Sequence, residues 1–169
     1  EALYQDNGGA LYAARAVAAL WDSAAEAGAQ MHSGRRVEGI TPRAEGIAVS
    51  CANGETVLAD RLVVAAGGWS AGLATGLGIP LPMEISREQV CLFAARDDVD
   101  HRVGAMPTFV AHDGTRQFFG LPIMEEAGVK VGWNHSGTAI THPEQPTLID
   151  TANVQAICEF VERVLPHLD

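Results

Sequence analysis

The sequence predicts a mixed α/β fold made of two parts with different patterns of secondary structure. In the first part, a continuous apolar run at residues 62–66 leads into a pair of glycines, which is typical of a strand buried on both faces. In the second part, beyond Pro80, short β-rich runs are separated by turns and not by helices. These runs predict a mostly antiparallel sheet, completed by a helix near the end of the chain.

The composition is that of a folded domain and argues against nucleic acid as a partner. The chain has 169 residues, 47% of them hydrophobic, so it can bury a core. Acidic residues outnumber basic ones by 21 to 11, whereas a groove for nucleic acid needs clustered Lys and Arg. The longest uncharged run, 62–83, contains several glycines and prolines, so we expect no membrane span.

The cysteines indicate a reducing compartment. Cys51, Cys91 and Cys158 are widely spaced and form no CxxC motif. An odd number at such spacing argues against a disulfide framework or a zinc site. We therefore expect a cytoplasmic protein without a bound metal, and no signal peptide is visible.

The first part is expected to begin with a helix over residues 6–28. Asp6 or Asn7 would cap the helix, and Gly28 would end it. The expected buried face, at helical spacing, carries Leu11, Ala14, Ala18, Trp21 and Ala25.

Strands are expected next, at 29–32, 36–41, 47–51, 56–59 and 62–66. Asn53-Gly54 lies between two of these runs and favours a tight hairpin. After the glycines, a helix of small residues is expected up to Leu77, with Gly78 closing it.

The second part is expected to form strands at 89–94, 108–111, 117–123 and 129–134. A turn at 112–115 would join the middle two strands. Thr151 is expected to cap a final helix that ends at Pro166. The buried face of this helix would hold Val154, Ile157, Val161 and Val164.

The glycine turn at residues 65–70 is the first place where chemistry is expected. A buried strand delivers the chain to two positions without side chains, so backbone N–H groups there can approach a ligand closely. An ordinary strand-to-helix turn is the alternative, because the chain contains no GxGxxG motif.

Lys130, the one lysine among eleven basic residues, is the second place. Alternation puts Lys130 on one face of its strand and Val129 and Val131 on the other. A compact ammonium lining a cavity could stabilise an anion formed during a reaction, but a lysine in water at a sheet surface is the alternative. Similarly, the aromatic residues of segment 117–122 would either wall a pocket or belong to the core.

Together these segments resemble a family, the flavin-dependent amine oxidoreductases of the D-amino-acid-oxidase class. The branch they are most similar to contains monomeric sarcosine oxidase and N-methyl-tryptophan oxidase. The similar segments, in order, are 28–29 with 36–40, then 62–70, 87–90, and finally 119–122 with 129–132. Each motif is weak alone, but their order and spacing cover nearly the whole chain.

The resemblance implies two domains and one cofactor. Residues 1–79 would form part of a Rossmann-like FAD-binding domain, and residues 80–169 part of a substrate domain with a mostly antiparallel sheet. The residues that would contact FAD are Val37, Ala66, Gly67, Gly68 and Trp69.

The resemblance also implies roles at the reaction site. Lys130 would lie beside the flavin ring as the lysine that activates oxygen. Phe119, Asn134 and His135 would line the substrate pocket. Phe119 stands where sarcosine oxidase has a Tyr, and Asn134 where it has a His, so sarcosine itself is in doubt as the substrate.

The implied reaction is the oxidation of a secondary amine or an amino acid. Hydride would pass from the carbon next to nitrogen to the flavin, the imine would hydrolyse, and O₂ would be reduced to H₂O₂. Two alternatives stay open. One is a dehydrogenase of the same fold with another electron acceptor, and the other is a cofactor-free module.

The resemblance further implies that the chain is a central fragment of such an enzyme. The family's glycine-rich phosphate loop and its flavin-linked cysteine match nothing in these 169 residues. We therefore expect the isolated chain to bind FAD poorly and to be inactive. Apolar surface left uncovered could then favour self-association.

Overall fold

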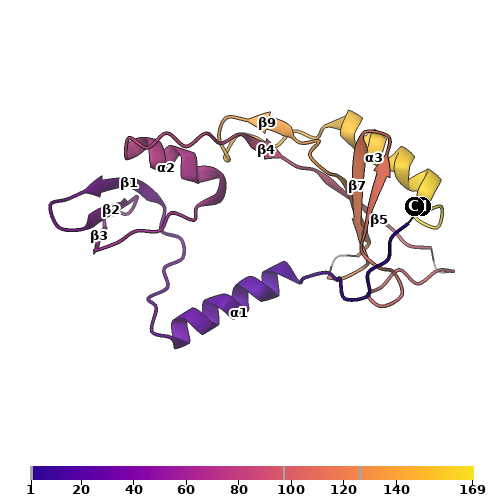
Figure 1. The fold of residues 1–169 in the computed structure, drawn as a ribbon, viewed down its shortest axis with the longest axis horizontal. Helices are drawn as coiled ribbons and strands as arrows, with labels where there is room; N and C mark the ends of the chain where they lie inside the picture. The colour runs from indigo at the N-terminus through magenta and orange to yellow at the C-terminus, as the bar shows by residue number, and fades with distance from the viewer. Residues whose placement is uncertain (1, 97, 126) are drawn as a thin grey trace. The chain divides into compact units, whose positions relative to one another are not determined.

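The chain folds as two compact units that are both built from helices and mostly antiparallel strands. The computed structural model describes residues 2–96, 98–125 and 127–169. One unit comprises residues 2–20, 86–138 and 146–169, and the other comprises 21–85 and 139–145. Helices and antiparallel sheets occur together, as the fold class predicted from the sequence requires (Figure 1).

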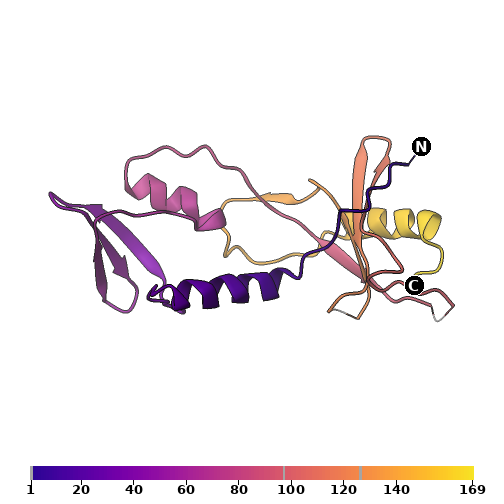
Figure 2. The same cartoon turned by 60° about the horizontal axis from the view of Figure 1, so that its bottom comes forward.

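A four-stranded antiparallel sheet forms the centre of the first unit, and the four strands expected here are confirmed. Its strands lie in the order β5-β8-β7-β6, with bounds Val90–Phe93 (β5), Phe109–Asp113 (β6), Arg116–Leu121 (β7) and Val129–Trp133 (β8). Helix α3 (Thr151–Val164) lies beside this sheet in both ribbon views (Figures 1 and 2).

The hydrophobic core of the first unit lies between α3 and one face of the sheet. Val129 and Val131 of β8 are fully buried there, because alternate residues of a strand point to the same side. The ring of Phe118 in β7 stacks on Phe160 of α3, with centroids 4.2 Å apart and planes at 10°. Ile157 of α3 is also fully buried, so this layer is closed to water.

Helix α3 begins one residue earlier than expected. The cap is Asp150 and not Thr151, because the Asp150 carboxylate accepts a hydrogen bond of 3.1 Å from the N–H of Asn153. Ile157 and Val161 are buried as expected, but Val164 is 44% exposed. That residue occupies the last position of the helix.

The second unit contains a three-stranded antiparallel sheet of β1 (Val37–Pro42), β2 (Ile47–Cys51) and β3 (Thr56–Ala59). The expected hairpin between β2 and β3 is confirmed. Gly54 has φ +83° and its N–H donates to the Cys51 carbonyl, so the tight turn needs a residue that adopts positive φ easily. The expected strand at 29–32 does not form.

Helix α1 (Ala13–Glu26) is shorter and more exposed than the sequence predicted. Gly8 and Gly9 precede it, and glycine is a poor helix former, so neither Asp6 nor Asn7 can act as the cap. Gly28 does follow the helix with φ +91°. None of the side chains in α1 is buried, and Trp21 is 42% exposed, so the expected buried face is wrong.

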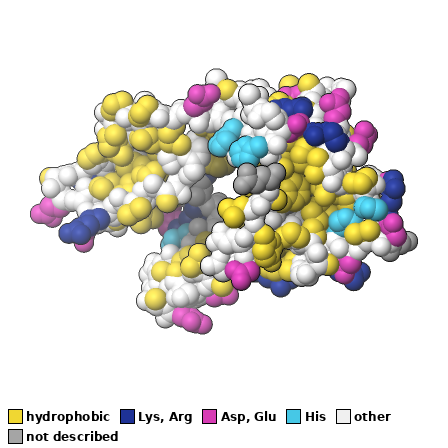
Figure 3. Space-filling view, turned by 45° about the vertical axis from the view of Figure 1, so that its right-hand side comes forward, with side chains coloured by type: hydrophobic (Ala, Val, Ile, Leu, Met, Phe, Trp, Pro, Cys, Tyr) yellow, Lys and Arg dark blue, Asp and Glu magenta, His cyan; other side chains and the backbone are white. Residues whose placement is uncertain are grey.

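Residues 62–66 form no strand, which corrects a second expectation. Val63 is 87% exposed. A strand needs a neighbour to bond its backbone, and no described segment pairs with this one. Apolar side chains are accordingly spread over the surface of the described chain (Figure 3).

Short elements complete the fold. The turn η1 (Gly67–Trp69) leads into helix α2 (Ser70–Gly76), as expected. Strands β4 (Ile85–Arg87) and β9 (Thr138–Ile140) pair in a two-stranded sheet that was not expected. None of the described helices has both the length and the apolar character needed to cross a membrane.

Candidate functional site

The sheet face that points away from α3 carries Lys130. The alternation expected along β8 is confirmed, because Val129 and Val131 point into the core while Lys130 is half-buried. The register pairs Lys130 with Leu92 of β5 and with Leu121 of β7. Directly paired residues share a face of the sheet, so the Lys130 side chain leaves the sheet between those of two leucines. We call this surface the Lys130 face.

Phe119 belongs to the Lys130 face and lies across Gly132. The register pairs Gly132 with Phe119 on one side and with Val90 on the other. A Cβ atom on residue 132 would lie 2.6 Å from Cζ of Phe119 and 3.1 Å from Cγ1 of Val90. The missing side chain therefore lets the ring close over β8 next to Lys130. The adjacent Phe118 points into the core, which confirms the core interpretation for that residue, while Phe119 stays a predicted pocket residue.

Gly132→Ala should disturb the Lys130 face. The new methyl group would push the Phe119 ring away from β8, and overpacking of this kind costs about 1–3 kcal/mol. We expect a lower Tm for the full-length protein. Gly72→Ala in α2 is the matched control, because a Cβ atom there meets nothing within 4 Å. A wild-type Tm for Gly132→Ala would contradict the described position of Phe119.

Asn134 follows β8 and lies on the Lys130 face by the same alternation as Lys130 and Gly132. Its Nδ2 donates to Oε1 of Gln117 over 2.6 Å, and its backbone N–H donates to the carbonyl of Gln117 over 2.7 Å. His135 comes next, is exposed, and has φ +56°. The structure thus brings Phe119, Lys130 and Asn134 onto one face, with His135 in the adjoining turn.

Helix α3 supports the turn that carries Asn134 and His135. Ser136 Oγ donates to the carbonyl of Trp133 over 2.7 Å, and Nδ2 of Asn153 donates to Ser136 Oγ over 2.5 Å. Asn153 is buried in the first turns of α3. The end of β8 is therefore held from the core side through Asn153 and from the Lys130 face through Gln117.

The residues expected to contact FAD lie in the second unit. Gly67 has φ +52°, and a Cβ atom on it would meet nothing within 4 Å, so its backbone is open to an approaching group. Gly68 differs, because a Cβ atom there would lie 3.0 Å from Pro143. The N–H of Ala66 donates to Oγ of Ser70 over 3.2 Å.

Two exposed side chains complete this set. Trp69 is 49% exposed, and Val37, the first residue of β1, is 36% exposed. An open glycine backbone flanked by an exposed indole leaves room for the close approach of a flat ring system such as that of a flavin. The residues present are therefore compatible with contact to FAD.

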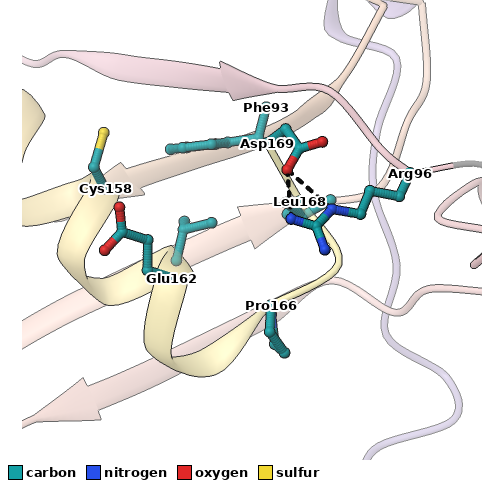
Figure 4. A pocket seen from close by; sticks show the side chains of 8 residues that line it. Phe93, Arg96, Cys158, Glu162, Pro166, Leu168 and Asp169 are labelled. Atoms are coloured by element: carbon teal, nitrogen blue, oxygen red, sulfur yellow. Dashed lines mark hydrogen bonds and ion pairs between the residues drawn. The ribbon is translucent and has the colours of Figure 1, made fainter.

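A cavity of about 370 Å³ lies on the other side of the four-stranded sheet, toward α3 (Figure 4). Phe93, Cys158 and Leu168 line it, and Arg96 forms a 2.7 Å ion pair with Asp169 at its rim. That hydrogen bond lowers the pKa of the Asp169 carboxyl group. None of the lining residues belongs to the Lys130 face, so this cavity is separate from the expected pocket.

Cys91 is not set up for nucleophilic chemistry. Burial raises the pKa of the Cys91 thiol, and the nearby Cys158 raises it further. A raised pKa keeps the thiol protonated, whereas a reactive cysteine needs its thiolate. In the described part of the chain no group of three His, Cys, Asp or Glu side chains could hold a metal ion.

Sequence reasoning gave no site role to several residues of the Lys130 face, among them Val90, Leu92, His112, Gln117 and Leu121. Alternation within segments 89–94 and 117–123 could have assigned most of them to faces. His112 was expected in a turn at 112–115, but it belongs to β6, so that turn is shorter than expected. The distance of these residues from Lys130 depends on the pairing of β5, β6, β7 and β8, which no single segment reveals.

Comparison with known proteins confirms the expected family. The family model described as FAD dependent oxidoreductase (DAO) matches residues 1–169. The peroxisomal sarcosine oxidases of Mus musculus and Homo sapiens are 31% and 32% identical, over 98% of this chain and 43% of each relative. The monomeric sarcosine oxidase of a Bacillus species is 25% identical, with the same coverage.

A solved structure shares the fold. NikD, described as an unusual amino acid oxidase essential for nikkomycin biosynthesis, superposes with a TM-score of 0.63 at 22% identity. The match covers 90% of this chain and 40% of NikD. The chain thus spans less than half the length of the relatives it matches. Because the family model matches from the first residue to the last, the chain belongs to the FAD-dependent oxidoreductases of the DAO family.

Proposed function

We propose that this chain is part of an FAD-dependent oxidase that acts on a secondary amine or an amino acid. The observation that carries the proposal is Lys130, the one lysine of the chain, whose position in β8 lies between Leu92 and Leu121 on a mostly apolar sheet face. The relatives named as sarcosine oxidases and as an amino acid oxidase support the substrate class.

In this proposal the two parts of the chain have different roles. Residues 1–79 contribute to FAD binding through Val37 and the turn Ala66–Trp69, and residues 80–169 contribute the substrate side. The open backbone of Gly67 and the half-exposed indole of Trp69 support the first assignment. The shared face of Phe119, Lys130 and Asn134 supports the second.

Bound FAD would accept the hydride that leaves the carbon next to the substrate nitrogen and would pass the electrons to O₂, yielding H₂O₂. The ammonium of Lys130 would stabilise negative charge that develops as oxygen is reduced. Its alkyl stem lies along two leucines, where the charge is less screened than in water. Phe119 and Val90 would exclude water beside it.

The test uses the purified full-length protein. We expect flavin absorbance at one FAD per chain and loss of that absorbance when sarcosine or another N-methyl amino acid is added without oxygen. Admission of air should restore the absorbance and release H₂O₂. Bleaching without recovery in air would favour the dehydrogenase of the same fold. A flavin-free protein would contradict the proposal and favour the cofactor-free module.

Location and partners follow the same proposal. The substrate would be a small amine, and O₂ the second substrate. A cytoplasmic location stays a prediction from the cysteines, while two of the relatives are named as peroxisomal.

A further inference from the structure

His112, Gln117 and Asn134 form a row of hydrogen bonds across three strand ends of the Lys130 face. Nε2 of Gln117 lies 3.3 Å from Nε2 of His112, and Oε1 of Gln117 accepts from Nδ2 of Asn134 over 2.6 Å. His112 and Gln117 are directly paired residues of β6 and β7, so they share this face. None of these contacts is part of the hydrophobic core.

The row has a direction because each amide has one accepting end and one donating end. Gln117 turns its oxygen toward Asn134 and its nitrogen toward His112. Asn134 must therefore present its nitrogen to Gln117. Its Oδ1 is therefore the end of the amide that is not used by Gln117, and Oδ1 can only accept a hydrogen bond.

We propose that Gln117 is a positioning residue that holds Oδ1 of Asn134 toward the ligand, so that the site selects amines with an N–H group. The inference rests on the proposed function, because it concerns the amine bound at that site. A neutral secondary amine carries one N–H to donate to Oδ1. A neutral tertiary amine carries none, and it would leave the Asn134 carbonyl without its bond.

A purely structural role for Gln117 predicts a different result when its side chain is replaced. The backbone N–H of Asn134 donates to the backbone carbonyl of Gln117 over 2.7 Å, and this bond does not depend on the Gln117 side chain. Replacing the side chain therefore frees the Asn134 amide to rotate while the end of β8 stays tied to β7. Selectivity should change without loss of the fold.

The experiment compares Gln117→Met and Gln117→Glu in the full-length protein. Met keeps the length of the side chain but lacks the accepting oxygen, whereas Glu keeps an oxygen that can accept from Nδ2 of Asn134. The measured quantity is kcat/KM for an N-methyl amino acid divided by kcat/KM for its N,N-dimethyl counterpart. We expect this ratio to fall about three- to tenfold in Gln117→Met, mainly through KM, and to return toward wild type in Gln117→Glu. Gln155→Met on α3 is the matched control and should leave the ratio unchanged.

A second measurement, amide hydrogen exchange, does not depend on oxidation of the amine. In a sample with ¹⁵N-labelled asparagine, one side-chain amide proton of Asn134 should exchange slowly in wild type and quickly in Gln117→Met. Fast exchange in the wild type would overturn the inference, and so would an unchanged selectivity ratio once exchange has become fast. A wild type without flavin would sink the proposed function, whereas the exchange measurement would still decide whether Gln117 holds Asn134.

Discussion

Lys130→Met should slow the consumption of O₂ by the full-length protein by about 10²–10³-fold, the usual loss when one stabilising group at a developing charge is removed. Methionine keeps the length and apolar character of the stem between Leu92 and Leu121 but removes the positive charge. The step that precedes oxygen should be affected less. The measurement is rapid mixing of the amine-treated protein with O₂, compared with anaerobic bleaching by the amine.

The control for this variant removes one positive charge elsewhere. Arg43 lies in the exposed turn between β1 and β2. Arg43→Met should leave the rate of reaction with O₂ and the rate of anaerobic bleaching unchanged. If Lys130→Met reacted with O₂ as fast as the wild type, the role assigned to the lysine would be wrong. A different electron acceptor would then be the better interpretation.

Phe118→Ala should destabilise the first unit more than any other single change considered. The ring is fully buried and stacks on Phe160, and truncating such a phenylalanine to alanine costs about 3–5 kcal/mol. A cavity would open between β7 and α3, because the surrounding side chains can collapse only in part. We expect a clear fall of the denaturant midpoint, measured in the full-length protein by the near-ultraviolet signal.

The adjacent Phe119→Ala is the matched comparison for Phe118→Ala. Phe119 lies on the opposite face of the same strand and is only half-buried, so its removal should cost less stability. It should instead raise KM for the amine. Equal destabilisation by the two variants would contradict the described register of β7.

Local patterns predicted part of the fold well. The hairpin of β2 and β3 was expected at its observed residues, because Asn53-Gly54 encodes the turn within four residues of chain. The alternation around Lys130 was also correct, since buried valines on either side of a polar residue leave a strand only one orientation.

Sequence patterns that indicate burial were less informative, because burial depends on other elements that pack against the segment. Residues 62–66 read as a buried strand, and α1 read as a helix with a buried face, yet both are exposed in the described chain. Apolar side chains show that a segment is suited to burial, but burial itself requires another element to cover it. The N-cap of α3 is Asp150 and not the expected Thr151. Asp and Thr are both good N-cap residues, so the sequence alone does not distinguish the two positions, and the backbone geometry does.

The sequence by itself determined the family, the antiparallel second part, and the side of β8 to which Lys130 points. Only the tertiary structure decided what surrounds that lysine. Leu92 and Leu121 flank it, and Gln117 sets the amide of Asn134, because β5, β7 and β8 pair in one particular register. Such a register arises from hydrogen bonds and packing between strands far apart in the chain, so no single segment of sequence contains it.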